Sequence, residues 1–185
     1  MGEGIRVGIN GFGVIGRTFF RIISNRQLFH VVAINDINND IGNLAYLMKY
    51  DSTHGALKEE IISEKDKIIF NKMPIRIFSE ERIEDVPWEQ LDVDVVVGCT
   101  GVLRNVANAP KCLGGSVKKV IFSDSPKDVD FTFVLGVNED DYDNEKHNII
   151  SGSICDVVGL APAIKKLDDN NSEDFDFSKA EKIVV

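Results

Sequence analysis

Residues 5–17, IRVGINGFGVIGR, place a short apolar run directly before three glycines with the spacing GxGxxG. Ile5, Val7 and Ile9 alternate as in a buried strand, and apolar residues follow the glycines at helical spacing. In such a strand–loop–helix unit, the first glycine makes a tight turn, the second admits a pyrophosphate close to the backbone, and the third lets helix pack on strand. The stretch therefore predicts a dinucleotide site in which N–H groups at the start of the helix hold phosphates.

An acid follows at the distance that such a unit requires. The next apolar run, residues 31–34, leads into Asp36, which lies 20 residues after Gly16. Its carboxylate would accept hydrogen bonds from ribose hydroxyls and repel a 2′-phosphate. No arginine or lysine stands next to Asp36 in the sequence, so NAD is favoured over NADP. A glycine turn in a nucleotide-free α/β domain is the alternative, which strand, spacing and acid together disfavour. The loop residues expected to contact NAD are Asn10, Gly11, Phe12, Gly13, Val14 and Ile15.

Composition and charge disfavour several other classes of function. With 185 residues, the chain is long enough for one domain, or for one domain and part of a second. Its net charge of -9 disfavours a nucleic-acid surface as the primary role, because phosphates would be repelled. The three cysteines form no CxxC motif, which fits a reducing compartment. We expect a cytoplasmic protein, since the sequence has no signal-peptide pattern and no apolar run near the ~20 residues of a membrane span.

The order of apolar segments predicts an α/β fold: a Rossmann-type, doubly wound, mostly parallel sheet with a small antiparallel insertion. A helix is expected after Asp40, which can cap it. Short strands separated by polar turns predict the antiparallel insertion, not another crossover, and these are residues 60–62, 67–70 and 75–78. Further strands are expected over residues 118–123, 131–137 and 148–151, with a short helix over residues 105–113 and a polar loop over 138–147.

Two features at the ends of later elements are candidates for chemistry. A valine run in residues 94–99 is typical of a central parallel strand, and Thr100 and Gly101 follow at its carboxyl end. Ligands bind at those ends of open α/β sheets, so this dipeptide is a second candidate contact to the cofactor. Cys155 lies at or just before the N-terminus of another helix, where a thiolate nucleophile is favoured. A buried, inert cysteine is the alternative that the position alone leaves open.

Short motifs along nearly the whole chain follow the order of a known family. They are INGFG at residues 9–13, IND at 34–36, KYDSTHG at 49–55, TGV at 100–102, GG at 114–115, KKVI at 118–121, GVN at 136–138 and LAP at 160–162. With these motifs the chain resembles the phosphorylating glyceraldehyde-3-phosphate dehydrogenases. The resemblance implies an NAD-binding Rossmann domain over residues 1–152 and the start of a catalytic domain over residues 153–185. It also implies that the backbone at Glu81 reaches adenine and that Ser123 lies beside the cofactor.

The resemblance also implies a reaction. In the family, a cysteine at the start of this helix attacks the aldehyde of glyceraldehyde 3-phosphate, the thiohemiacetal passes hydride to NAD, and phosphate splits the resulting thioester. Ser151 and the LAP motif fix the register, so the nucleophile falls on Cys155. The chain is therefore expected to belong to a glycolytic oxidoreductase that forms a homo-oligomer or pairs with a family subunit.

The neighbourhood of Cys155 departs from the family pattern. The family has Ser before the cysteine and Thr-Thr-Asn-Cys after it, whereas this chain has Ile154 before it and Asp156 after it, followed by Val-Val-Gly. The hydroxyls that would bind a phosphate are therefore absent from these positions, which are substrate contacts in the family. Asp156 adds a charge that opposes a thiolate and repels a phosphorylated substrate. Val14 replaces the usual arginine of the glycine loop, but backbone groups do most of the binding there.

The family's general base is a histidine beyond the next strand, and this sequence stops before it. His30, His54 and His147 do not match that position. Three interpretations remain: a truncated part of an active dehydrogenase, a degenerate NAD-binding module that acts through protein partners, or a different aldehyde oxidation that retains the cysteine. We further expect residues 182–185, KIVV, to form an unpaired strand edge that recruits a second copy or a family subunit.

Overall fold

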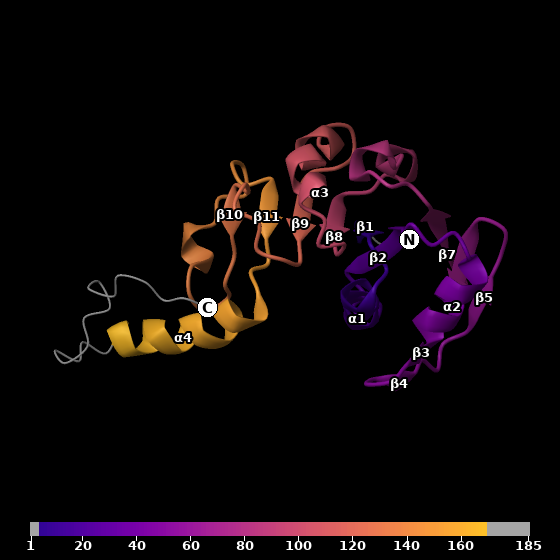
Figure 1. Ribbon diagram of the computed structural model, residues 1–185, viewed down its shortest axis with the longest axis horizontal. Coiled ribbons are helices and arrows are strands. Elements are labelled where there is room, and N and C mark those ends of the chain that lie inside the picture. Colours follow the sequence, from indigo (N-terminus) through magenta and orange to yellow (C-terminus); the bar gives the residue numbers. More distant parts are fainter. Residues whose placement is uncertain (1–3, 170–185) are drawn as a thin grey trace.

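The computed structural model describes residues 4–169, and within them a nine-stranded sheet forms the body of the molecule (Figure 1). The sheet order is β10-β11-β9-β8-β1-β2-β7-β6-β5, in which neighbours from β10 to β7 are parallel and β6 is antiparallel to β5 and β7. Its strands are β1 Ile5–Asn10, β2 Phe29–Asn35, β5 Ile61–Ser63, β6 Lys67–Phe70, β7 Met73–Phe78, β8 Val95–Gly98, β9 Lys119–Phe122, β10 Phe131–Thr132 and β11 Ile149–Ser151. A separate two-stranded sheet pairs β3 Tyr50–Asp51 with β4 Gly55–Ala56.

Helices cover both faces of the sheet, which confirms the doubly wound prediction. The α-helices of residues 4–169 are α1 Val14–Ile23, α2 Ile41–Lys49, α3 Leu103–Asn108 and α4 Cys155–Asp169. Phe20 of α1 and Leu44 of α2 pack with Val7 of β1 in one core cluster. Val106 of α3 packs with Trp88 in a second cluster on the other face. The predicted cap of α2 is also confirmed, because the Asp40 carboxylate accepts a hydrogen bond from the N–H of Asn43 at 2.9 Å.

The antiparallel pairing predicted for residues 60–78 is confirmed, but the prediction that this segment contains no further crossover is wrong. β7 pairs in parallel with β2, with Ile77 opposite Ile34, so the chain does make another crossover there, through α2. β5, β6 and β7 nevertheless pair antiparallel in chain order, as predicted, and β6 runs opposite to its two neighbours. The turn between β6 and β7 indicates their antiparallel pairing, but no local pattern shows that β7 also pairs in parallel with β2 on its other side. The insertion therefore extends the edge of the main sheet.

Two later elements are shorter than their sequence patterns suggest. The strand expected over residues 131–137 stops at Thr132, because the Asn138 side chain accepts from the N–H of Val134 and donates to the carbonyl of Thr132. These bonds fold the chain into a turn that also uses Gly136 at φ +84°. The helix expected over residues 105–113 starts at Leu103 and gives way to a 3₁₀ turn, Ala109–Cys112.

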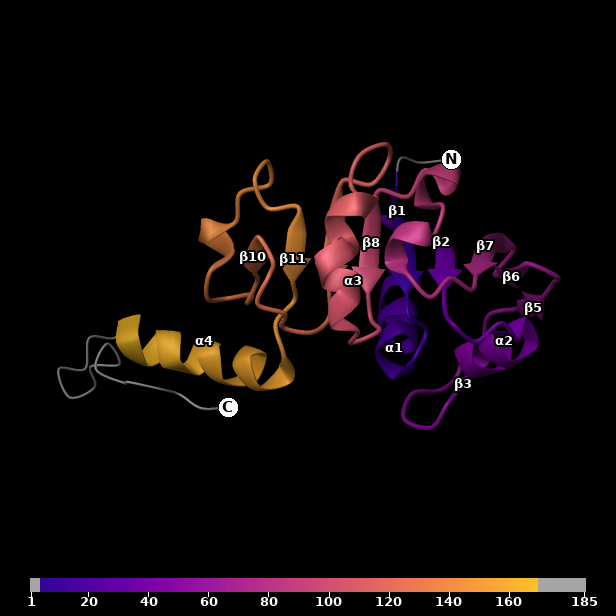
Figure 2. The same ribbon diagram turned by 45° about the horizontal axis from the view of Figure 1, so that its top comes forward.

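α4 begins next to the carboxyl end of β11 and runs outward past β10 (Figure 2). Lys165 ties it to the preceding loop, since its Nζ donates to the carbonyl of Val137 at 2.6 Å. A domain boundary between residues 152 and 153 stays a prediction. The strand edge expected at residues 182–185 lies outside the described residues. None of the helices in the described part of the chain is long and apolar enough to cross a membrane.

Candidate functional site

The glycine loop lies at the carboxyl end of β1, and its three glycines have different surroundings. Gly11 has φ +95°, and a Cβ there would lie 2.7 Å from Cγ2 of Thr100. A Cβ on Gly16 would lie 2.0 Å from the carbonyl oxygen of Gly11, so this glycine lets α1 pack against the turn. A Cβ on Gly13 would meet no atom within 4 Å. The middle glycine is therefore required by neither packing nor backbone strain, and it borders open space where a ligand can approach the backbone.

The N-terminus of α1 opens onto the same space. Gly13 is its N-cap residue, no side chain caps the first turn, and that turn contains no acid. The side chains of Val14 and Ile15 are 66% and 54% exposed. Behind the loop, Nη1 of Arg17 donates to the carbonyl of Phe12 at 2.9 Å and holds the turn in place. Uncapped N–H groups at the positive end of a helix are a suitable site for an anion.

Asp36 lies directly against the glycine loop. Its Oδ2 accepts a hydrogen bond from the N–H of Phe12 at 2.6 Å, and its Oδ1 accepts one from the N–H of Asn38 at 2.9 Å. The residue is half-buried, so its carboxylate is held in one orientation at the end of β2. A carboxylate has about four lone-pair sites, so ribose hydroxyls can still donate to it.

Two buried asparagine side chains, those of Asn10 and Asn35, support the glycine loop and Asp36. Asn10 is 1% exposed, and its Oδ1 accepts from Nδ2 of Asn35 at 2.7 Å. The Asn35 side chain also bonds both backbone groups of Glu80, at 2.9 and 2.8 Å, while the carbonyl of Asn10 accepts from the N–H of Cys99. The amides thus tie together the ends of β1, β2, β7 and β8. A direct contact between Asn10 and a cofactor stays a prediction. Sequence reasoning missed the supporting role of Asn35, although it stands next to Asp36.

The loops after β8 and β9 complete this edge of the sheet. Oγ1 of Thr100 accepts from Nδ2 of Asn105 at 2.9 Å, and Gly101 has φ +66° and is exposed. Ser123 is exposed just beyond β9, and its N–H donates to the carbonyl of Gly98. Beside it, burial raises the pKa of the Cys99 thiol to about 11, which suits a packing residue better than a nucleophile. Thr100, Gly101 and Ser123 therefore lie at the same carboxyl edge as the glycine loop.

Glu81 lies in the loop after β7 and is ion-paired. Its Oε1 accepts from Nη2 of Arg104 at 2.7 Å, although both side chains are more than half exposed. The hydrogen bond and the charge of Arg104 lower the pKa of Glu81 below its ordinary value. Sequence reasoning did not anticipate Arg104 at this edge, because no local pattern joins a residue after β7 to one in α3.

Cys155 is the first residue of α4, and its side chain is exposed, so it is not a buried packing cysteine; its role as a nucleophile stays a prediction. Its Sγ lies 3.8 Å from Oδ1 of Asp156, and Ile154 is half-buried before it. Ser153, at φ +65°, sets the direction in which the helix starts, and its N–H donates to Oγ of Ser151 at 2.9 Å. The thiol is therefore presented at a helix N-terminus, with one carboxylate directly beside it.

The three histidines are engaged elsewhere. Nδ1 of His54 lies 3.0 Å from Oδ1 of Asp51 in the turn between β3 and β4. His147 stacks on Phe131 with ring centroids 4.7 Å apart, and His30 belongs to β2. His147 also helps to pack residues 138–147, which were expected to be only a solvated loop. Within residues 4–169, no group of three or more histidine, cysteine or acidic side chains is arranged to hold a metal ion.

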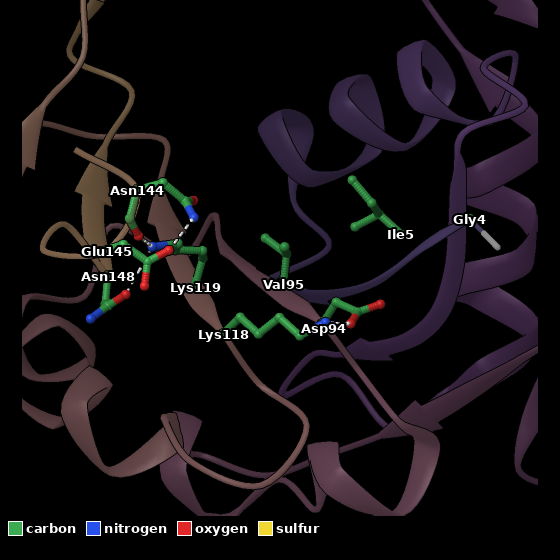
Figure 3. A pocket seen from close by; sticks show the side chains of 9 residues that line it. All are labelled: Gly4, Ile5, Asp94, Val95, Lys118, Lys119, Asn144, Glu145 and Asn148. Carbon is green, nitrogen blue, oxygen red and sulfur yellow. Dashed lines mark hydrogen bonds and ion pairs between the residues drawn. The ribbon is translucent and has the colours of Figure 1, made fainter. Parts of the chain in front are cut away.

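A groove of about 910 Å³ lies at the opposite end of the sheet (Figure 3). It is lined by residues at the starts of β1, β8, β9 and β11, and these include Asp94, Lys118 and Lys119. Both lysines are already paired: Lys118 with Asp94 at 2.7 Å, and Lys119 with the carbonyl of His147 and other acceptors nearby. The groove is separate from the glycine loop, and among its described lining residues both lysines are already engaged.

Comparisons with known proteins agree with this geometry. Residues 5–106 match the family model described as glyceraldehyde 3-phosphate dehydrogenase, NAD binding domain. The chain is 45% identical to glyceraldehyde-3-phosphate dehydrogenase 2 of Streptomyces avermitilis over 90% of its own length and 50% of the relative's. It is 43% identical to glyceraldehyde-3-phosphate dehydrogenase 1 of Bacillus cereus over 89% and 49%, and 41% identical to the Geobacillus stearothermophilus enzyme over 88% and 48%. The chain thus spans about half the length of the curated relatives that it matches.

Proposed function

The chain belongs to the glyceraldehyde-3-phosphate dehydrogenase family, and from this premise we propose that its sheet binds NAD and that Cys155 is the nucleophile of an aldehyde oxidation. The relatives are named as dehydrogenases, so they do not favour the alternative of a degenerate, non-catalytic module. The observation that carries the proposal is the pairing of an uncapped helix N-terminus with an acid. Gly13 borders open space at the start of α1, and Asp36 is fixed against the loop by the N–H of Phe12.

The residues present fit NAD. Backbone N–H groups at Gly13, Val14 and Ile15 would hold the pyrophosphate, and Asp36 would accept from the adenosine ribose. Thr100, Gly101 and Ser123 would line the same edge, with the backbone at Glu81 near adenine. When bound, NAD supplies the acceptor for a hydride.

Cys155 would supply the covalent step. Its sulfur would add to the aldehyde carbon, the aldehyde oxygen would take up a proton, and the thiol proton would pass to a base. Within residues 4–169, no histidine forms a hydrogen bond with Cys155. The Sγ of Cys155 has one hydrogen-bond partner there, Oδ1 of Asp156. Glyceraldehyde 3-phosphate and phosphate are the proposed substrates, and a cytoplasmic, glycolytic role follows from them. Because of Ile154 and Asp156, phosphate binding would depend on groups other than these two.

Isothermal titration of the 185-residue chain with NAD tests the cofactor part of the proposal. We expect saturable one-to-one binding of modest affinity, and NADP should bind more weakly. Absence of NAD binding by a folded chain, checked by circular dichroism, would overturn it. Retained binding in Cys155→Ser would show that the cofactor site and the thiol act separately.

A further inference from the structure

An ion pair joins the loop after β7 to the start of α3 across the carboxyl ends of β1 and β2. Arg104, the second residue of α3, donates from Nη2 to Oε1 of Glu81 at 2.7 Å. Arg104 follows β8 and Glu81 follows β7, and in the sheet order β1 and β2 lie between those two strands. The pair therefore spans the strands that end in the glycine loop and in Asp36.

The loop that carries Glu81 also touches the residues around Asp36. The N–H of Asp36 donates to the carbonyl of Phe78 at 3.1 Å, and Oγ of Ser79 donates to the carbonyl of Ile37 at 3.3 Å. Glu81 and Asp36 thus belong to one rim of the site. The ion pair brings an arginine to this rim, where the sequence next to Asp36 contains no cation.

An arginine at this rim is a suitable ligand for a phosphate group. A guanidinium has five N–H donors in a planar fork, and this geometry suits the 2′-phosphate that distinguishes NADP from NAD. In this chain, Oε1 of Glu81 accepts from Nη2 of Arg104, so the carboxylate engages one donor of the fork and pairs its charge with that of the guanidinium. Arg82 on the same loop is likewise occupied, because it donates to Oε1 of Glu84 at 3.0 and 2.6 Å.

We propose that the Glu81–Arg104 pair is a specificity determinant of the cofactor site. Glu81 withholds the Arg104 guanidinium from the ribose 2′ position, and together with Asp36 it favours NAD over NADP. This inference rests on the proposed NAD-binding function, and it assigns the discrimination to the loop after β7 and the start of α3 in addition to the acid after β2.

The test is the ratio of dissociation constants for NADP and NAD, measured by calorimetry on the 185-residue chain. The variants are Glu81→Gln, Arg104→Gln and the double variant. Glu145→Gln is the matched control, since it removes the same charge from an exposed residue in the groove at the opposite end of the sheet (Figure 3). Exposed ion pairs of this kind are weak, so we expect Glu81→Gln to lower the NADP/NAD ratio about two- to fivefold. The double variant should show no such decrease in the ratio, and Glu145→Gln should leave the ratio unchanged.

The outcomes separate this inference from the function on which it rests. If the wild type binds NAD and Glu81→Gln leaves the ratio within the error of the control, the inference is wrong and the proposed function stands. The inference is also wrong, and the proposed function still stands, if the double variant gains NADP affinity as strongly as Glu81→Gln does. The gain would then not come from the Arg104 guanidinium. If the folded wild type binds neither cofactor, both the inference and the proposed function are wrong. Retained NAD binding in each variant shows that it is folded.

Discussion

The Asp36 carboxylate accepts a 2.6 Å hydrogen bond from the backbone N–H of Phe12, so the acid expected to bind the ribose hydroxyls also anchors the glycine loop. Substitution of Asp36 should therefore affect the shape of the loop and the recognition of ribose together. An asparagine keeps an acceptor for the N–H of Phe12 but loses the charge, whereas an alanine loses both. These two variants separate the effects.

We predict that Asp36→Asn weakens NAD binding less than Asp36→Ala does, and that both variants lose discrimination against NADP. Hydrogen bonds to a charged group contribute about 1.5–3 kcal/mol, so Asp36→Ala should raise the dissociation constant of NAD roughly 10- to 100-fold. Calorimetry with both cofactors is the measurement, and Glu145→Gln is the control for loss of charge. Equal binding of NAD and NADP by the wild type would show that the role given to Asp36 is wrong.

Gly13→Ala and Gly16→Ala should separate binding from folding. Gly13 has φ −67° and open space at its Cβ position, so alanine should leave the thermal midpoint unchanged or slightly higher while blocking the approach of phosphate. We expect its NAD dissociation constant to rise about tenfold or more, which corresponds to about 1.4 kcal/mol.

Gly16→Ala should behave in the opposite way, because its Cβ would lie 2.0 Å from the carbonyl of Gly11. The loop or α1 must shift to accommodate this Cβ, and the shift should lower the free energy of unfolding by about 1–3 kcal/mol, measured by denaturant unfolding without cofactor. If Gly13→Ala destabilises the chain as much as Gly16→Ala does, the middle glycine has a packing role and its assignment to phosphate binding fails.

The glycine loop, Asp36 and the start of α4 could be predicted because their signals are local. Fixed spacing between strand, glycines and acid sets the first unit, and Cys155 heads an apolar-periodic helix. The features that the sequence did not yield join residues far apart in the chain. Asn35 meets Glu80 45 positions away, and Arg104 meets Glu81 23 positions away. Such contacts depend on the order of strands in the sheet, and no periodicity records that order.

We predict that the 185-residue chain does not oxidise glyceraldehyde 3-phosphate at a measurable rate with NAD and phosphate. General acid–base help contributes roughly 10²–10⁴-fold, and the described histidines are bonded away from Cys155. The assay follows NADH absorbance, with NAD binding of the same sample as the control. Turnover that disappears in Cys155→Ser would contradict the prediction.

The three thiols of the chain have sharply different surroundings. Cys155 is exposed, whereas burial raises the pKa of Cys99 and of Cys112 to about 11. At pH 8 only about one in a thousand of these two thiols would be ionised, so iodoacetamide should label Cys155 first in the folded chain, as read by peptide mass spectrometry.

The raised pKa values also predict a pH dependence of stability. In the unfolded chain these thiols have an ordinary pKa near 9, so from pH 9 to 11 the unfolded state binds fewer protons than the folded state, and the free energy of unfolding should fall. Cys112→Ala should reduce the slope of this fall, and Cys155→Ala, at an exposed thiol, is the matched control. If Cys99 or Cys112 reacts as fast as Cys155 at pH 8 under native conditions, that thiol is more accessible than the partly buried Cys99 or the buried Cys112 of the structure.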